Sequence, residues 1–367
     1  MAKMRGYLTV VGAAALSGLL VPPGVRAQGP VAKNYQTVKV AEGIYAFVSP
    51  EPNTPLVNGN SVAVIGDDGV LVVDPGQFPS VARKVIGEIR HMTDKPVRFV
   101  VNTHWHPDHW AANGEYRQAF PGVAIVATSY TRRMIQTAAQ PFVDPKNIES
   151  GLQGLRKVLE VGKRGDGSPI PADRKQYLAD ELTDYEDFVG ELRQMRPAPP
   201  DLTFDQALTV HLGKREAKLM WLGRGNTGGD AVIYVPDAKV LMTGDLVVAP
   251  TPYAIGSFLG DWIETLNKLM AIEATTIVPG HGPVMHDWTY VKTEQGLLES
   301  VLTQVRQAAG DGLSLEGARK KVDLESYRKQ LCGDSTRRDI AFREFFSKPA
   351  VERAYEEAKL NSEEGLH

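Results

Sequence analysis

The sequence predicts a mixed α/β fold in which helices cover β-sheets. Short β-branched runs alternate with turn-forming residues over residues 34–128, and strand patterns return from about 203 to 244. Amphipathic helical patterns stand between or after these strands, near 79–91, 109–119 and 258–272. Residues 129–196 and the chain after Thr289 are instead charged and helix-forming. We therefore expect a sheet-based domain with two additional helical regions.

The first 27 residues have the composition of a secretory signal peptide. Two basic residues precede a short apolar stretch, Pro22-Pro23 ends it, and Val25-Arg26-Ala27 suits cleavage before Gln28. A membrane anchor is the alternative, but the apolar stretch is shorter than the roughly 20 residues that cross a bilayer. We expect cleavage after Ala27, export to the periplasm or beyond, and no stable membrane association afterwards. The single cysteine, Cys332, cannot form a disulfide within the chain.

The octet Asn102–His109 is the strongest functional signal. It directly follows the apolar run Val97–Val101, which has the length and β-branched composition of a buried strand. Pro107 bends the chain inside the octet, so that its histidines and aspartate can face two neighbouring ions. The potential ligands are His104, His106, Asp108 and His109. Imidazole and carboxylate together suit zinc, with iron or manganese as alternatives. The alternative without a function is a helix N-terminus capped by Asp108, with the histidines as surface residues. The presence of three of the eight histidines in this octet argues against it.

Four further motifs follow strand patterns along the chain. They are Asp67–Gly76, Gly223–Asp230, Leu241–Asp245 and Val278–Gly282. With the His-x-His-x-Asp-His octet, their order and content resemble the metallo-β-lactamase superfamily. The resemblance implies a four-layer αββα sandwich over residues 28–290. The charged, helix-forming stretches add a helical insertion at about 129–200 and a helical C-terminal extension over 291–367.

The resemblance implies two adjacent metal sites. His104 and His106 would hold the first ion, and Asp108, His109 and His281 the second. Asp245 would bridge the two ions through its two oxygens. Asp74 has two interpretations of equal weight: it orients a metal ligand, or it caps the turn before Pro75-Gly76. His91, His211, His286 and His367 are not expected to be ligands.

Asn226 departs from the family pattern, which places a histidine at this position to complete the first site. An amide oxygen is neutral and a weaker zinc donor than imidazole. Three consequences stay open. The first site is weak and often empty, it binds a different metal, or a water takes the missing place.

Such a centre favours hydrolysis. The resemblance implies one or two zinc ions whose bound hydroxide attacks an ester, thioester, lactone or amide bond of a small molecule. Asp108 would accept or position the proton of the water. Family members that hydrolyse β-lactams efficiently tend to carry cysteine or serine where this chain has Asp245. The alternative is a non-hydrolytic member, either an iron-dependent enzyme of sulfur redox chemistry or a metal-binding protein without catalysis.

The rest of the sequence bears on partners and on the walls of the site. The 41 Lys and Arg residues balance 44 Asp and Glu residues without a basic run, which argues against a nucleic-acid partner. Trp105 and Trp110 either line the site or pack beneath it, and the core is the more common place for tryptophan. The apolar segment Val247–Tyr253 would form a rigid wall. Arg224 is a candidate contact for an anionic group, but an ion pair or a position in solvent is the more common arrangement. The sequence leaves the oligomeric state open.

Overall fold

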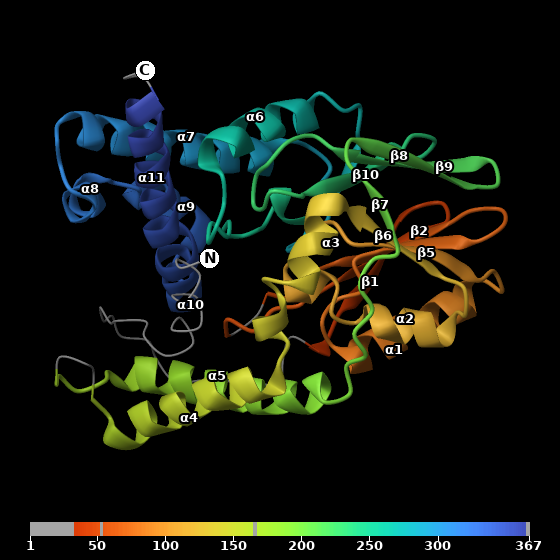
Figure 1. Ribbon diagram of the computed structural model, residues 1–367, viewed down its shortest axis with the longest axis horizontal. Helices are drawn as coiled ribbons and strands as arrows, with labels where there is room; N and C mark the ends of the chain where they lie inside the picture. Colours follow the sequence, from red (N-terminus) through yellow and green to blue (C-terminus); the bar gives the residue numbers. More distant parts are fainter. Residues whose placement is uncertain (1–32, 52–53, 164–166, 365–367) are drawn as a thin grey trace.

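A computed structural model describes residues 33–51, 54–163 and 167–364 of the chain. The expected signal peptide, residues 1–27, and His367 lie outside the described residues. Two β-sheets lie at the centre, with helices on their outer faces (Figure 1). No helix among the described residues is both long and apolar enough to cross a membrane.

The first sheet has seven strands in sequential order. Its strands are β1 (Gln36–Ala41), β2 (Ile44–Val48), β3 (Ser61–Ile65), β4 (Val70–Val73), β5 (Val97–Val101), β6 (Ala124–Thr128) and β7 (Leu202–Phe204). Strands β1 to β4 are antiparallel neighbours, whereas β4 to β7 run parallel. The helices α1 (Pro79–Met92) and α2 (Asn113–Ala119) connect the parallel strands, as expected for crossover connections.

The second sheet has five strands in the order β12-β11-β10-β9-β8. These are β8 (Ala207–Leu212), β9 (Arg215–Trp221), β10 (Ala231–Val235), β11 (Val240–Met242) and β12 (Thr276–Val278). Only β11 and β12 pair in parallel. The helix α6 (Leu259–Met270) connects them, so both strands deliver their carboxyl ends to the same edge.

Three apolar clusters hold the four layers together. On β4, Leu71 and Val73 face the second sheet, whereas Val70 and Val72 face the α1 side, as the alternation of a strand requires. Leu71 and Val73 belong to one apolar cluster between the sheets, together with Leu219 and other residues of β9 to β11. A separate cluster joins the second sheet to α6 and the C-terminal helices. The predicted αββα sandwich is confirmed.

Helices dominate the two regions outside this sandwich. Between β6 and β7 lie α3 (Ser129–Gln136), α4 (Pro145–Val161) and α5 (Ala172–Leu192). After β12 come α7 (Thr289–Gly310), α8 (Leu315–Lys321), α9 (Glu325–Cys332), α10 (Thr336–Ala341), a π-helical turn (Phe342–Ser347) and α11 (Lys348–Glu364). Figure 1 shows α4 and α5 side by side at one end of the molecule and α7 and α11 beside α6.

Candidate metal centre

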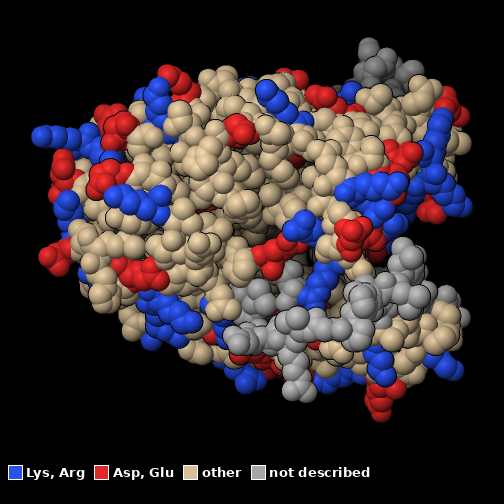
Figure 2. Space-filling view, turned by 180° about the vertical axis from the view of Figure 1, so that it is seen from behind, with Lys and Arg blue, Asp and Glu red and all other residues tan. Residues whose placement is uncertain are grey.

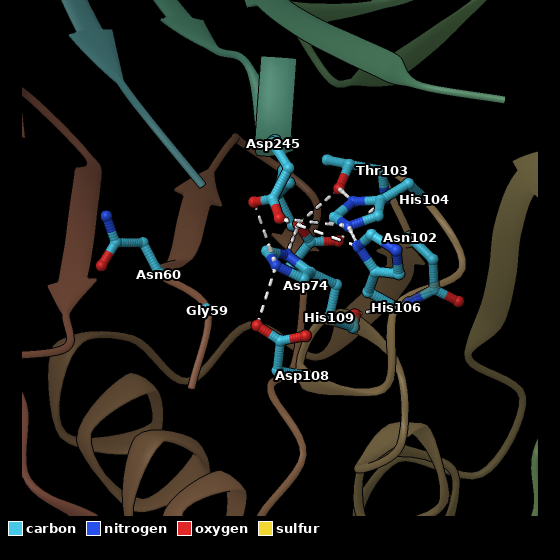
Figure 3. Close-up of polar contacts among 12 residues, drawn as sticks. Gly59, Asn60, Asp74, Asn102, Thr103, His104, His106, Asp108, His109 and Asp245 are labelled. Carbon is cyan, nitrogen blue, oxygen red and sulfur yellow. Dashed lines mark hydrogen bonds and ion pairs between the residues drawn. The ribbon is translucent and has the colours of Figure 1, made fainter. Parts of the chain in front are cut away.

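The histidines and carboxylates of the candidate centre follow the ends of three strands. The octet leaves β5 and forms a short 3₁₀ turn at Pro107–His109. Asp245 lies in the 3₁₀ turn Gly244–Leu246 just after β11, and His281 follows β12. Both sheets therefore contribute ligands to one place. Figure 3 shows the side chains of His104, His106, Asp108, His109 and Asp245 directed toward one another.

His104, His106 and Asp245 form the first cluster. His104 Nε2 lies 2.9 Å from His106 Nδ1 and 3.4 Å from Asp245 Oδ2. His106 Nδ1 lies 3.9 Å from the same carboxylate oxygen. Three potential donor atoms thus surround one point at the end of the two sheets.

Asp108, His109 and His281 form the second cluster. Asp108 Oδ2 lies 3.2 Å from His109 Nε2 and 3.0 Å from His281 Nε2. The other oxygen of Asp245, Oδ1, lies 3.2 Å from His109 Nε2 and 3.5 Å from His281 Nε2. Asp245 therefore presents one carboxylate oxygen to each cluster, which is the arrangement a bridging ligand requires.

Asp74 fixes the orientation of both clusters. Its Oδ2 accepts hydrogen bonds from Thr103 Oγ1 at 2.7 Å and His109 Nδ1 at 2.8 Å, and its Oδ1 accepts from Thr103 N at 2.8 Å. Because the Thr103 hydroxyl donates to Asp74, it accepts the proton of His104 Nδ1, 2.9 Å away. Asp74 has a φ of +50°, a conformation that aspartate tolerates better than most residues. Of its two interpretations, the structure shows the one in which Asp74 orients a histidine.

These hydrogen bonds place imidazole lone pairs inside the centre. With Nδ1 protonated, His104 and His109 each turn an unprotonated Nε2 toward the other donors. Asp108 Oδ2 and Asp245 Oδ1 are buried and have no hydrogen-bond partner among the described residues. Converging lone pairs and unpaired carboxylate oxygens repel one another unless a cation lies between them. The residues therefore fit a metal ion at each cluster.

The electrostatics differ between the two clusters. Burial and the neighbouring His109 lower the pKa of His104 to about 4, which keeps the ring neutral and able to bind a metal. Burial alone would raise the pKa of Asp108, but the imidazoles of His109 and His281 hold it well below its usual range. Asp108 is thus ionised at neutral pH. Burial alone would lower the pKa of His109 and that of His281, but the carboxylates of Asp108 and Asp245 raise both, so a metal ion would replace a proton at the second cluster.

Asn226 is buried, and its hydrogen-bond partner Tyr253 contacts His106 of the first cluster. Its Nδ2 donates to the carbonyl oxygen of Tyr253 at 2.6 Å, and the Tyr253 ring lies edge-on to His106 with ring centroids 5.3 Å apart. This hydrogen bond identifies the nitrogen and the oxygen of the amide group. The Oδ1 atom is then left buried, with no hydrogen-bond partner in the described part of the chain. An oxygen in that position is available to a metal.

No further histidine among the described residues joins the centre. His91 is exposed and contacts Gly87 O, whereas His211 pairs with Glu216 at the surface. His286 is exposed beyond the end of β12. Arg224 pairs with Asp261 and lies over the ring of Phe258, which agrees with the expected ion pair.

Aromatic rings surround the His106 side of the centre. Trp105 lies 4.8 Å from the His106 ring and 6.4 Å from Phe142, which belongs to the helical insertion. Tyr253 continues the series beyond His106 and stacks on Phe345 of the C-terminal extension, 6.1 Å away. All four flanking rings are partly exposed. Trp110, by contrast, is buried and donates its Nε1 proton to Trp105 O.

The sequence did not single out Phe142 or Phe345, because an isolated phenylalanine in a helical region gives no functional signal. It also missed Asn58, Gly59 and Asn60, of which Gly59 packs against His109 and Asn60 binds the loop that carries His281. The run Asn58-Gly59-Asn60 before a strand has a recognisable composition, but turn formation explains it equally well.

The structure combines a sandwich of two sheets with histidines and carboxylates that meet at the strand ends. This combination is characteristic of a metal-binding fold. Residues 54–281 match the Metallo-beta-lactamase superfamily, and the chain belongs to this family. The predicted resemblance is thereby confirmed, and the His/Asp centre is a metal site typical of the family.

Several relatives show how far the similarity extends. The chain is 28% identical over 226 residues to a linear primary-alkylsulfatase from Pseudomonas sp., covering 59% of this chain and 40% of the relative. It is 30% identical over 106 residues to a hydroxyacylglutathione hydrolase from Gloeobacter violaceus, covering 28% and 40%. The structure of the sec-alkylsulfatase Pisa1 from Pseudomonas sp. superimposes with a TM-score of 0.60 at 16% identity, covering 88% of this chain and 50% of that one. The chain thus spans about half the length of these relatives or less, and the structural match shows the fold.

Proposed function

We propose that this protein is an exported metal-dependent hydrolase. Its substrate would be a small molecule with an ester, thioester, lactone or amide bond. The observation that carries the proposal is Asp245, whose two oxygens face one histidine-containing cluster each. This arrangement supports a dinuclear centre, and dinuclear centres of histidine and carboxylate ligands suit hydrolysis.

The residues divide into two ligand groups. His104, His106 and the amide oxygen of Asn226 would hold one ion, and Asp108, His109 and His281 the other, with Asp245 between them. The mixture of imidazole and carboxylate favours zinc, and it also accepts iron or manganese. When bound, such ions lower the pKa of a water molecule and polarise the bond to be cleaved.

Asp108 is the residue we assign to proton handling. Its carboxylate is ionised, and Oδ2 faces the centre without a hydrogen-bond partner among the described residues. It can therefore accept a hydrogen bond from a water molecule and hold that molecule in line with the substrate. Asp74 would keep His109 in the tautomer that leaves Nε2 free for the metal.

The surroundings of His106 support an apolar group on the substrate. The rings of Trp105, Tyr253, Phe142 and Phe345 offer apolar faces, and no Lys or Arg belongs to this series. Relatives that carry the names alkylsulfatase and hydroxyacylglutathione hydrolase add sulfate esters and thioesters to the classes worth testing. Asp245, in place of the cysteine or serine of efficient β-lactamases, makes β-lactams poor candidates.

The proposed partner is a small molecule rather than nucleic acid. Figure 2 shows Lys and Arg interspersed with Asp and Glu over the face it presents, rather than gathered into one basic surface. Phosphate backbones are bound through concentrated positive charge. We expect no retention on a nucleic-acid column at 150 mM salt, a concentration at which basic nucleic-acid-binding proteins still bind.

Hydrolysis is tested with the mature protein, purified without a metal-binding tag and loaded with zinc, iron or manganese. The substrates are dodecyl sulfate, p-nitrophenyl butyrate, S-lactoylglutathione, a δ-lactone and a chromogenic cephalosporin. Asp245→Asn removes one of the shared carboxylate oxygens, and Asp237→Asn is the matched control at an exposed ion pair with Arg215. We expect turnover that Asp245→Asn abolishes and Asp237→Asn preserves.

The second candidate is a non-hydrolytic member of the family, and Asn226 is the observation that favours it. Iron retained through purification, with no turnover of any substrate at full metal loading, would replace the hydrolase by the iron-dependent sulfur redox enzyme. Absence of any tightly held metal would leave a binding role.

Export has its own test. Expression of the full chain in a bacterium, followed by fractionation and N-terminal sequencing, should give a periplasmic or secreted protein that begins at Gln28. A full-length product in the cytoplasm or membrane would contradict the proposed signal peptide.

A further inference from the structure

Three consecutive residues just before β3, Asn58, Gly59 and Asn60, lie beside the second cluster, where Gly59 packs against His109 and Asn60 binds the loop of His281. We call them the 58–60 segment. All three are buried, and none is a candidate ligand. Figure 3 shows Gly59 and Asn60 on a stretch of chain that passes beside His109 and Asp108.

Asn60 binds the loop that carries His281. Its Nδ2 donates to Pro279 O at 3.0 Å and to Gly282 O at 2.9 Å, and its backbone N–H donates to Gly280 O at 2.7 Å. Its Oδ1 accepts from Ser49 N at 3.0 Å, which fixes the orientation of the amide. The residues before and after His281 are therefore both held by one side chain.

Gly59 packs against the other histidine of the second cluster. A β-carbon on this residue would lie 2.5 Å from Cε1 of His109 and 2.8 Å from Nδ1, so only glycine lets the ring lie so close to the backbone. The Gly59 N–H also donates to Asp108 O at 3.2 Å. Two neighbouring residues of the segment thus contact all three members of the second cluster or the loops that hold them.

Asn58 connects the segment to the turn after Asp74. Its Oδ1 accepts from Gln77 N at 2.9 Å and lies against Gly76, where a β-carbon would come within 2.6 Å of it. The segment therefore meets the loops after β4, β5 and β12. Strand β3 belongs to the seven-stranded sheet, whereas His281 follows a strand of the other sheet. The 58–60 segment is consequently a polar connection between the two sheets at the centre.

We infer that the 58–60 segment positions the Asp108–His109–His281 group for metal binding, with Asn60 as the residue that holds His281 in place. The inference rests on the metal centre of the proposed function but not on its chemistry. Without the Asn60 amide, the buried carbonyl group of Pro279 and the partly buried one of Gly282 lose this donor, and the loop regains hydrogen bonds only by moving. Movement of His281 away from Asp108 opens the second cluster, whereas the first cluster contains no group that Asn60 touches.

The test is metal binding rather than turnover. Metal-free protein is titrated with zinc against a chromophoric chelator, and with cobalt for its visible absorption. His281→Ala identifies which of the two metal-binding steps belongs to the second cluster. We expect Asn60→Ala to weaken that step about 10- to 100-fold, the effect typical of residues that orient metal ligands, and to leave the other step unchanged.

Two further variants separate positioning from general destabilisation. Ser61→Ala removes a buried hydrogen bond to Val73 O from the next residue along and should leave both steps unchanged. Gly59→Ala pushes the His109 ring and should weaken the same step as Asn60→Ala, so that the inference is testable even if Asn60→Ala does not fold. Equal weakening of both steps, no weakening of either, or a wild type that binds no ion at the second cluster overturns the inference. Failure of every hydrolysis assay, with these binding results intact, would refute only the proposed hydrolase.

Discussion

Asp74→Asn is the substitution that tests the hydrogen-bonding scheme of the centre most directly. The carboxylate of Asp74 accepts three hydrogen bonds, one on Oδ1 and two on Oδ2. An amide has the same shape and tolerates the positive φ of this position. However, one of its two ends is an N–H₂ group, which cannot accept a hydrogen bond.

Either orientation of the new amide breaks part of the scheme. With nitrogen at the Oδ2 position, both Thr103 Oγ1 and His109 Nδ1 lose their acceptor. His109 then turns to the tautomer with Nε2 protonated, which blocks the atom that faces Asp108 and His281. With nitrogen at the Oδ1 position, only the N–H of Thr103 is left without a partner. The second orientation is the less costly one. We therefore expect the loss of metal affinity to lie near the lower end of the roughly 10- to 100-fold range for residues that orient metal ligands. That loss is about tenfold in metal affinity, or about 1.4 kcal/mol.

The assay is chelator competition at pH 7.5, with zinc affinities measured for both binding steps. Asp67→Asn is the matched control, because Asp67 accepts a backbone hydrogen bond from Lys214 on an exposed turn far from the centre. We expect its affinities to equal those of the wild type. If Asp74→Asn binds the ion of the second cluster within twofold of the wild-type affinity, the conclusion that Asp74 positions this cluster is wrong.

Three further outcomes follow from the structure. Asn226→His replaces a neutral amide by imidazole, so zinc affinity at the first cluster should rise at least tenfold in the same competition assay; unchanged affinity would mean that this residue does not face the metal. Burial raises the pKa of Glu181 from 4.5 to about 7. Between these two pH values the folded chain keeps the proton on Glu181, whereas the unfolded chain has released it. The free energy of unfolding therefore falls as pH rises through this window. Glu181→Gln should therefore match the wild type in urea unfolding at pH 4 and exceed it at pH 8 by up to about 3 kcal/mol; an equal difference at both pH values would contradict this assignment. Leu298→Ala empties a fully buried position on α7, in the apolar cluster that joins α6 to the C-terminal helices. It should cost about 2–5 kcal/mol in the same unfolding assay, and a cost below about 1 kcal/mol would mean that the extension is not part of the core.

The strands and helices of the sandwich could be predicted because their patterns are local. Val97–Val101 was placed at the bounds that β5 has, and the helix expected near 79–91 is α1 (Pro79–Met92). The start of α2 was less accurate, since the helix expected from 109 begins at Asn113. A 3₁₀ turn at Pro107–His109 intervenes, because the chain there bends to aim Asp108 and His109. The division of the strands between two sheets came from the family resemblance and not from periodicity.

Ligand identities could be proposed from motifs, but their surroundings could not. Asp74 was left between two interpretations, because only the fold brings Thr103 and His109 to its carboxylate. The contribution of Phe345 to the rings around His106 depends on how the extension packs on the loop of Tyr253, 92 residues earlier in the chain. No sequence period encodes such a contact. The role of Asn226 stays a prediction, now with a buried unpaired oxygen to support it.

The candidate ligands of the centre follow strands of both sheets, so metal binding affects how readily the two sheets separate. His104, His106, Asp108 and His109 follow β5, whereas Asp245 and His281 follow β11 and β12. An ion held by both groups is a cross-link whose strength depends on the supply of metal, and its binding free energy opposes any separation of the sheets. Amide hydrogen exchange should therefore slow together at the ends of β5, β11 and β12 when metal is added, while β1 and β8, at the outer edges, exchange as before. In the metal-free protein the amides at these same strand ends should exchange faster.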